Sequence, residues 1–160
     1  LNRCIDGLKE IIRTSNDVLL FPGSGTGGLE AAVVNTLSPG DKVLALDMGV
    51  FSRRFGEIAK NFGAEVATVK AEAGEAVSPE AIASVLAADK NFDIKAVLLT
   101  HNETATGVTM DLRGVRAAMD SLGHPALMLV DAVSSLAISP LDTDEIRADV
   151  VVSNADPGVT

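Results

Sequence analysis

The sequence predicts an α/β fold in which a mostly parallel sheet carries helices on both faces. The 160 residues fit one domain by the usual size of roughly 100 to 200 residues. The composition is 47% hydrophobic but only 3% aromatic, which suits apolar strands packed against Ala-rich helices. Short, wholly apolar runs also alternate with stretches of helical periodicity, which is the pattern of a parallel sheet covered on both faces.

The first elements follow from periodicity and turn residues. Residues 1–12 carry apolar side chains at helical spacing, which predicts an amphipathic helix. Residues 18–21 form a short apolar run that stops at Pro22 and Gly23, so we expect the first strand there. A glycine-rich turn and a helix over about 29–37 complete this unit of strand, loop and helix.

The rest of the chain continues the same alternation. We expect Ser78 to cap a helix that runs to about Ala88, because a serine before Pro79 suits a helix N-terminus. Helical spacing predicts two further helices over 51–62 and 112–122. The further strands are predicted over 43–46, 65–69, 96–99, 126–130 and 150–152.

The charge and the cysteine content exclude several classes of partner. The formal net charge is −9, and a surface without a basic stripe repels phosphate backbones, so we expect neither nucleic acid nor an anionic membrane as a partner. No apolar run approaches the ~18 uncharged residues of a membrane span. The single Cys4 cannot form an internal disulfide, and no Cys/His cluster indicates a metal site. A reducing cytoplasm is therefore the expected location.

The glycine-rich segment 23–28 is the first candidate site. Small residues let the backbone approach a phosphate closely, and a helix N-terminus aims free N–H groups at it. Ser24 and Thr26 add hydroxyl donors. A flexible turn between strand and helix, without any ligand, is the alternative interpretation.

The same segment also fits a dinucleotide-binding pattern. Gly23, Gly25 and Gly28 have the required spacing, and Asp47 ends the next predicted strand about 20 residues later, where a ribose-binding acid is expected. A Rossmann-type oxidoreductase domain is therefore a second hypothesis for this chain.

Two further polar segments follow predicted strands, where the ligands of parallel sheets collect. Residues 100–107 form a dense polar loop, and Asp131 stands at the end of the next strand. A carboxylate in such a buried place can hold a heteroaromatic nitrogen protonated, although Asp131 could also simply cap the next turn. His101 lacks the partners of a catalytic triad and could equally be a satisfied polar residue.

Together these segments resemble the class V, fold type I aminotransferases that use pyridoxal phosphate, and most closely the alanine/serine–glyoxylate aminotransferase group. The resemblance covers nearly the whole chain as a series of ordered blocks, which is far more specific than one glycine loop. The blocks are residues 21–27 with 29–32, 37–41, 49–51, 101–108 and 130–136.

The resemblance implies a site for pyridoxal 5'-phosphate and a role for each residue in it. The cofactor phosphate would be held by Ser24, Gly25 and Thr26. Phe51 would stack on one face of the pyridine ring, and Val133 would press on the other. Asp131 would pair with the pyridine nitrogen, and Thr104 would lie near the phenolic oxygen. The implied reaction moves an amino group from alanine or serine to glyoxylate, and Asp47 has no ribose role in it.

The sequence departs from the family pattern at Pro157, which falls on the position of the Schiff-base lysine. Proline has no amine, and none of the chain's lysines stands in a matching place. The resemblance therefore implies a chain that binds the cofactor but is inactive alone, with no catalytic residue assigned.

The resemblance also implies the domain organisation. Residues 1–160 would form part of the cofactor-binding large domain, without the small C-terminal domain of the family. Family members are homodimers, so we expect a homodimer for the full-length protein. A fragment of a transaminase, a short binding protein that does not turn over and a dinucleotide-binding oxidoreductase stay open as explanations.

Overall fold

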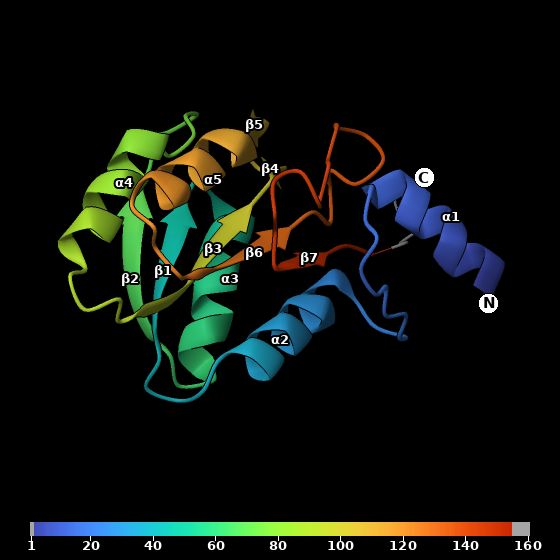
Figure 1. Cartoon of the computed structure of the whole chain (residues 1–160), viewed down its shortest axis with the longest axis horizontal. Coiled ribbons are helices and arrows are strands. Elements are labelled where there is room, and N and C mark those ends of the chain that lie inside the picture. The colour runs from blue at the N-terminus through green and yellow to red at the C-terminus, as the bar shows by residue number, and fades with distance from the viewer. Residues whose placement is uncertain (1, 155–160) are drawn as a thin grey trace.

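The computed structural model describes residues 2–154 and contains a five-stranded parallel sheet (Figure 1). Its strands lie in the order β2 (Glu65–Lys70), β1 (Lys42–Asp47), β3 (Ile94–Thr100), β6 (Leu127–Asp131) and β7 (Val150–Val152). Every neighbouring pair in this sheet is parallel. The carboxyl ends of the strands therefore meet at one edge, where the sequence places the candidate residues.

Helices cover both faces of the sheet (Figure 1). On one face lie α2 (Gly25–Thr36) and α3 (Val50–Asn61), and on the other lie α4 (Pro79–Ala88) and α5 (Leu112–Ser121). The N-terminal helix α1 (Asn2–Ile12) lies beyond β7, at the end of the molecule. The predicted fold class, a mostly parallel α/β sheet with helices on both faces, is confirmed.

Strand β1 shows how the sequence builds the core. Val43 and Ala45 pack in the cluster under α2 and α3, whereas Leu44 and Leu46 pack in the cluster under α4 and α5. Alternate residues of a strand point to opposite faces, so a strand with helices on both sides is apolar at every position. A continuous apolar run was therefore the correct signal for a doubly covered strand.

Most predicted elements are confirmed, with ends that shift by a few residues. The largest shift is in α2, which begins at Gly25 rather than Leu29, because the Ser24 hydroxyl caps the helix by accepting a first-turn N–H at 3.1 Å. The sequence did not predict the short strands β4 (Asn102–Glu103) and β5 (Val108–Thr109), which pair as an antiparallel hairpin.

The predicted strand over residues 18–21 is wrong. The segment has no regular structure, and three of its four apolar side chains are exposed, with Leu19 at 81% and Phe21 at 56%. The outer strand β7 pairs only with β6 among the described residues. An apolar run becomes a strand only where a neighbouring strand offers ladder hydrogen bonds, and no part of the described chain does so here.

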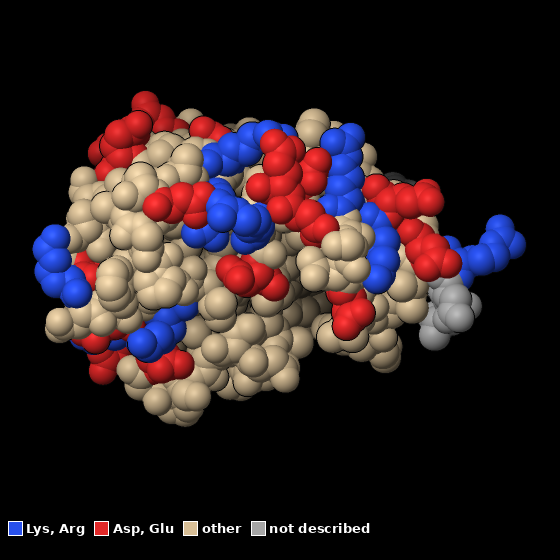
Figure 2. All heavy atoms as spheres, in the orientation of Figure 1, with Lys and Arg blue, Asp and Glu red and all other residues tan. Residues whose placement is uncertain are grey.

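Positive and negative side chains are interleaved on the surface. Figure 2 shows Lys and Arg side chains next to Asp and Glu on the visible face. Arg113 pairs with Glu145, and Arg13 pairs with Asp142 at 3.3 Å. These arginines are therefore neutralised locally rather than gathered into a basic surface.

Three observations on membrane helices, metal-binding groups and cysteine apply to residues 2–154. Within that range no helix combines the length and the apolar character that a membrane crossing requires. The His, Cys, Asp and Glu side chains of these residues form no group that could hold a metal ion. Cys4 is an exposed free thiol.

Candidate functional site

The carboxyl edge of the sheet collects the residues that the resemblance singled out. Asp131 at the end of β6 pairs in register with Thr100 at the end of β3. The β4–β5 hairpin follows β3 and carries Thr104 in its turn. The N-terminal ends of α2 and α3 contribute Ser24, Gly25, Thr26 and Phe51, and Val133 lies in the loop after β6. We call this group the edge site, and it consists of Ser24, Gly25, Thr26, Phe51, Thr104, Asp131 and Val133.

The N-terminus of α2 is the part of the edge site whose features suit an anion. Gly25 and Thr26 occupy the first two helical positions, whose N–H groups have no partner inside the helix. A Cβ on Gly25 would lie 2.8 Å from Val133 Cγ2, so glycine lets α2 approach the loop after β6. Free N–H groups, the positive end of the helix dipole and the hydroxyls of Ser24 and Thr26 suit a phosphate.

Asp131 is the buried acid of the edge site, with 4% of its surface exposed. Its carboxylate accepts the Val133 N–H at 3.0 Å and the Thr100 hydroxyl at 3.3 Å. Burial raises the pKa of Asp131, and the charge of Glu103 raises it further, while the two hydrogen bonds lower it. The balance favours a partner that brings a positive charge to this carboxylate, such as a protonated ring nitrogen.

Phe51 and Thr104 lie at the rim of the edge site. Phe51 is in the first turn of α3 with 38% of its surface exposed, and the Arg54 guanidinium lies 5.4 Å from its ring centroid. The Phe51 N–H donates to Glu103 at 3.0 Å, which joins α3 to the hairpin that carries Thr104. Thr104 itself is exposed. A partly exposed aromatic ring and a nearby hydroxyl suit a planar polar ligand.

The dinucleotide hypothesis finds no support in this geometry. The dinucleotide pattern requires a strand directly before the glycine loop and an acid on the neighbouring strand, but residues 18–21 form no strand. Instead, α2 packs against β7, and a Cβ on Gly28 would lie 2.7 Å from Val152 Cγ1. Asp47 ends β1, which β3 and β6 separate from β7, and it accepts hydrogen bonds from Arg53 and from a local backbone N–H, both at 3.2 Å. Gly25 and Gly28 therefore serve close packing, and Asp47 holds the start of α3.

His101 is the satisfied polar residue that the sequence left open as an alternative. It is buried, and its Nδ1 lies 2.9 Å from Ser135 Oγ. Its backbone N–H donates to the Asp131 carbonyl at 2.8 Å. Burial lowers the pKa of His101, so the ring favours its neutral form and supports the end of β6.

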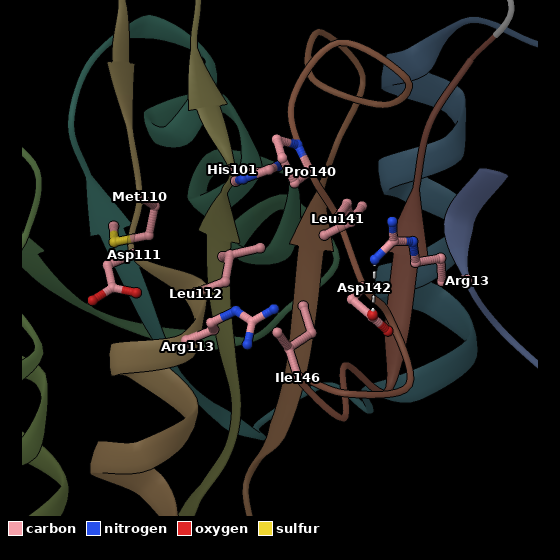
Figure 3. Close-up of a pocket in the computed structure, with 10 residues that line it drawn as sticks. All are labelled: Arg13, His101, Met110, Asp111, Leu112, Arg113, Pro140, Leu141, Asp142 and Ile146. Atoms are coloured by element: carbon pink, nitrogen blue, oxygen red, sulfur yellow. Dashed lines mark hydrogen bonds and ion pairs between the residues drawn. The ribbon is translucent and has the colours of Figure 1, made fainter.

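A separate cavity of about 180 Å³ lies beside the start of α5 (Figure 3). Residues 110–113 line one side of it, and residues 140–142 line the other, where Figure 3 shows Arg13 pointing toward Asp142. None of the residues that define the edge site lines this cavity. The cavity is therefore not the place where those residues converge.

The lysines on the strands lie away from Asp131. Lys42 and Lys95 stand at the beginning of β1 and β3, at the opposite edge of the sheet. Lys70 ends β2, which β1 and β3 separate from β6. Pro157, on the position of the family's lysine, lies outside the described residues.

Comparison with known proteins decides the family. The family model for aminotransferase class-V matches residues 2–156. The chain belongs to the class-V aminotransferase family. The resemblance indicated by the ordered sequence blocks is thereby confirmed.

Several curated relatives of this chain carry glyoxylate in their names. The L-aspartate–glyoxylate aminotransferase of Paracoccus denitrificans is 44% identical over 159 residues, which cover 99% of this chain and 40% of that protein. The serine–glyoxylate aminotransferase of Methylorubrum extorquens is 46% identical over 154 residues, which cover 96% of this chain and 38% of that protein. The chain thus spans 38–40% of the length of these relatives.

Solved structures share the class-V aminotransferase fold with this chain. An alanine–glyoxylate aminotransferase from Nostoc sp. superposes with a TM-score of 0.87 at 31% identity, over 95% of this chain and 39% of that one. A ureidoglycine–glyoxylate aminotransferase from Bacillus subtilis also gives 0.87, at 29% identity, over 95% and 38% of the two chains. The α/β fold predicted from the sequence is thus a fold type I aminotransferase fold.

Class-V aminotransferases depend on pyridoxal phosphate, and the edge site fits that cofactor. The first turn of α2 offers donors for a phosphate, and the buried carboxyl of Asp131 matches a protonated pyridine nitrogen. The contact between Gly25 and Val133 places these two parts side by side. Phe51 adds a partly exposed aromatic surface on the α3 side.

Sequence reasoning missed the role of Glu103. The residue lies within the polar block 101–108, but nothing in that block indicated that its side chain would be fully buried. Its hydrogen-bond partners at the start of α3 are 51 and 52 residues away along the chain. A local pattern carries no signal for such a contact.

Proposed function

We propose that this chain forms the cofactor-binding part of an aminotransferase that moves an amino group from alanine or serine to glyoxylate. The observation that carries the proposal is the position of the buried Asp131 beside the N-terminus of α2, joined through the contact of Gly25 with Val133. The printed names of relatives, which include serine–glyoxylate and L-aspartate–glyoxylate aminotransferases, support glyoxylate as the acceptor.

Each part of the edge site has one task in this proposal. The phosphate is bound by Ser24, Gly25 and Thr26 through hydroxyl and N–H donors. Asp131 holds a proton on the ring nitrogen, Phe51 and Val133 contact the ring faces, and Thr104 lies near the phenolic oxygen. Pyridoxal phosphate, when bound, supplies the electron sink for amino-group transfer. Asp131 keeps the nitrogen protonated because an unpaired buried carboxylate is unfavourable.

The 160-residue chain is proposed to bind the cofactor without turning over by itself. Pro157 offers no amine at the position of the family's lysine, and the strand lysines lie away from Asp131. Residues 1–160 accordingly form part of the large domain in this proposal.

A homodimer belongs to the same proposal. Several large apolar side chains are exposed, among them Leu19 at 81%, Phe21 at 56% and Ile138 at 82%. Exposed apolar surface of this kind is typical of association surfaces, and a second copy of the full-length protein would cover it. The proposed location is the cytoplasm, which suits a chain whose Cys4 is a free thiol.

Binding and turnover are tested separately. The chain is titrated with pyridoxal phosphate, and we expect a rise in Tm, because a ligand that binds only the folded state stabilises it. Asp131→Asn weakens binding, whereas Asp149→Asn does not, since the Asp149 carboxylate accepts the Met128 N–H at the opposite edge of the sheet.

Turnover is then measured as glycine formed after addition of alanine or serine with glyoxylate. We expect none from this chain alone. Absence of cofactor binding overturns the proposed function, and glycine formation overturns the proposed inactivity.

A further inference from the structure

Helix α3, which carries Phe51, begins without a cap of its own. Its N-cap residue is Gly49, which has no side chain, and no acidic residue lies in its first turn. The first N–H groups of a helix have no intrahelical partner and need another acceptor when they are buried. A carboxylate from a different element takes this role here.

Glu103 of β4 provides that carboxylate and is fully buried. Its Oε2 accepts the Phe51 N–H at 3.0 Å, the Ser52 N–H at 2.9 Å and the Ser52 hydroxyl at 3.0 Å. Gly49 leaves the space for this approach, because a Cβ there would lie 2.7 Å from Glu103 Cδ. A negative group at the positive end of the helix dipole is also electrostatically favourable.

The same residue orders the turn of the hairpin. Glu103 Oε1 accepts the Ala105 N–H at 3.3 Å, and the Glu103 carbonyl accepts the N–H groups of Thr106 at 3.1 Å and Gly107 at 2.8 Å. Thr104 therefore lies in a turn that is closed on Glu103. One side chain fixes the backbone of Phe51 and the backbone next to Thr104 relative to each other.

We propose that Glu103 is a positioning residue for the phosphorylated pyridine ligand. It does not touch the ligand but holds Phe51 and Thr104 in place around a ring that Asp131 anchors. This inference rests on the proposed function, since a ring must bind at the edge site for its position to matter. The charge of Glu103 also raises the pKa of Asp131, which strengthens the preference of that acid for a cationic ring.

The test compares the whole chain with Glu103→Gln and with Asp111→Asn as the matched control. Asp111 is also a carboxylate cap, since it accepts the Gly114 N–H at 2.9 Å at the start of α5, but it lies outside the edge site. The probe is pyridoxamine 5'-phosphate, whose amine cannot form an imine with surface lysines. The readouts are its Kd and the induced circular dichroism of the bound ring, measured together with Tm.

We expect Glu103→Gln to raise the Kd about fivefold, since loss of ring stacking is worth roughly two- to tenfold in affinity. The induced circular dichroism changes in the same variant, and Asp111→Asn alters neither readout. In a Phe51→Leu background the effect of Glu103→Gln is smaller, because the part that acts through the position of the Phe51 ring is lost and only the part that acts through Thr104 and Asp131 remains. If Glu103→Gln does not fold, Ser52→Ala removes part of the same contact, and the same readouts shift by about twofold in the same direction.

Each outcome bears on a different claim. A Kd and a dichroism unchanged in Glu103→Gln, or equal losses in Asp111→Asn, overturn the positioning role and leave the proposed function standing. Equal effects of Glu103→Gln with and without Phe51 also overturn it. A wild-type chain that does not bind the probe overturns the proposed function, and the positioning role falls with it.

Discussion

Gly25→Ala tests the contact that joins the first turn of α2 to the rest of the edge site. The new Cβ would lie 2.8 Å from Val133 Cγ2 and 3.0 Å from Cγ1, well inside the ~3.5–4.0 Å of an optimal carbon contact. Overpacking of this kind destabilises by ~1–3 kcal/mol, and the higher helix propensity of alanine offsets up to ~1 kcal/mol of that. We expect a net loss of ~1–2 kcal/mol, which corresponds to a fall in Tm of roughly 2–8 °C.

Urea unfolding followed by far-UV circular dichroism measures this loss, and the same helix offers a control. Gly27→Ala introduces a Cβ whose nearest neighbour is Ser24 Oγ at 3.7 Å, so it is expected to be neutral or stabilising. Val133→Ala in the Gly25→Ala background should restore part of the loss, because the two residues share one contact. Equal stabilities of Gly25→Ala and Gly27→Ala would refute the packing argument.

Three further predictions concern single groups. Hydrogen bonds from residues 14–16 lower the pKa of Asp144 to about 2, so the Asp144 carboxylate stabilises the fold above pH ~4 and this contribution is lost toward pH 2. When Tm is recorded from pH 6 down to pH 2, it should therefore fall less steeply in Asp144→Asn than in the wild type. The pKa of Asp131 is raised, chiefly by burial, so its ionisation opposes folding as the pH rises above ~4. In urea unfolding without ligand, the stability of Asp131→Asn relative to wild type should therefore rise between pH 4 and 7. A relative stability that falls over this range would contradict the argument. Gly49→Ala places a Cβ 2.7 Å from Glu103 Cδ and should cost ~1–3 kcal/mol in the same assay, whereas unchanged stability would show that the fit is loose.

The parts of the fold that were predictable are those whose signal is local. The alternation of Val43 and Leu44 between two cores leaves a continuous apolar run, and the serine and proline at 78 and 79 mark the start of α4 directly. Residues 18–21 carry the same apolar signal, yet a strand also needs a hydrogen-bonded neighbour, and composition says nothing about its presence. Glu103 was missed for a related reason, since its partners are distant in sequence.

The glycine loop shows the same limit at the candidate site. The spacing of Gly23, Gly25 and Gly28 fits both a dinucleotide and a simple phosphate cradle, because both chemistries need a close backbone approach at a helix N-terminus. What separates them is the surface that each glycine meets, which is Val133 for Gly25 and Val152 for Gly28. These contacts place α2 at β6 and β7 rather than beside Asp47 on β1. The ordered blocks elsewhere in the chain, and not the glycine spacing, carried the correct family.

The two parts of the edge site are held in place by different contacts. Asp131 ends a strand that is hydrogen-bonded on both sides, and Glu103 ties the hairpin and α3 to the same region. The first turn of α2 instead follows residues 17–23, which belong to no helix or strand, and reaches the sheet through the close contacts of Gly25 and Gly28. In the proposed function, a ligand with a phosphate at one end and a cationic ring at the other bridges these two parts. In the proposed function, a substitution that widens the glycine contacts displaces the first turn of α2 from the sheet and so lowers phosphate affinity, even where Asp131 is intact.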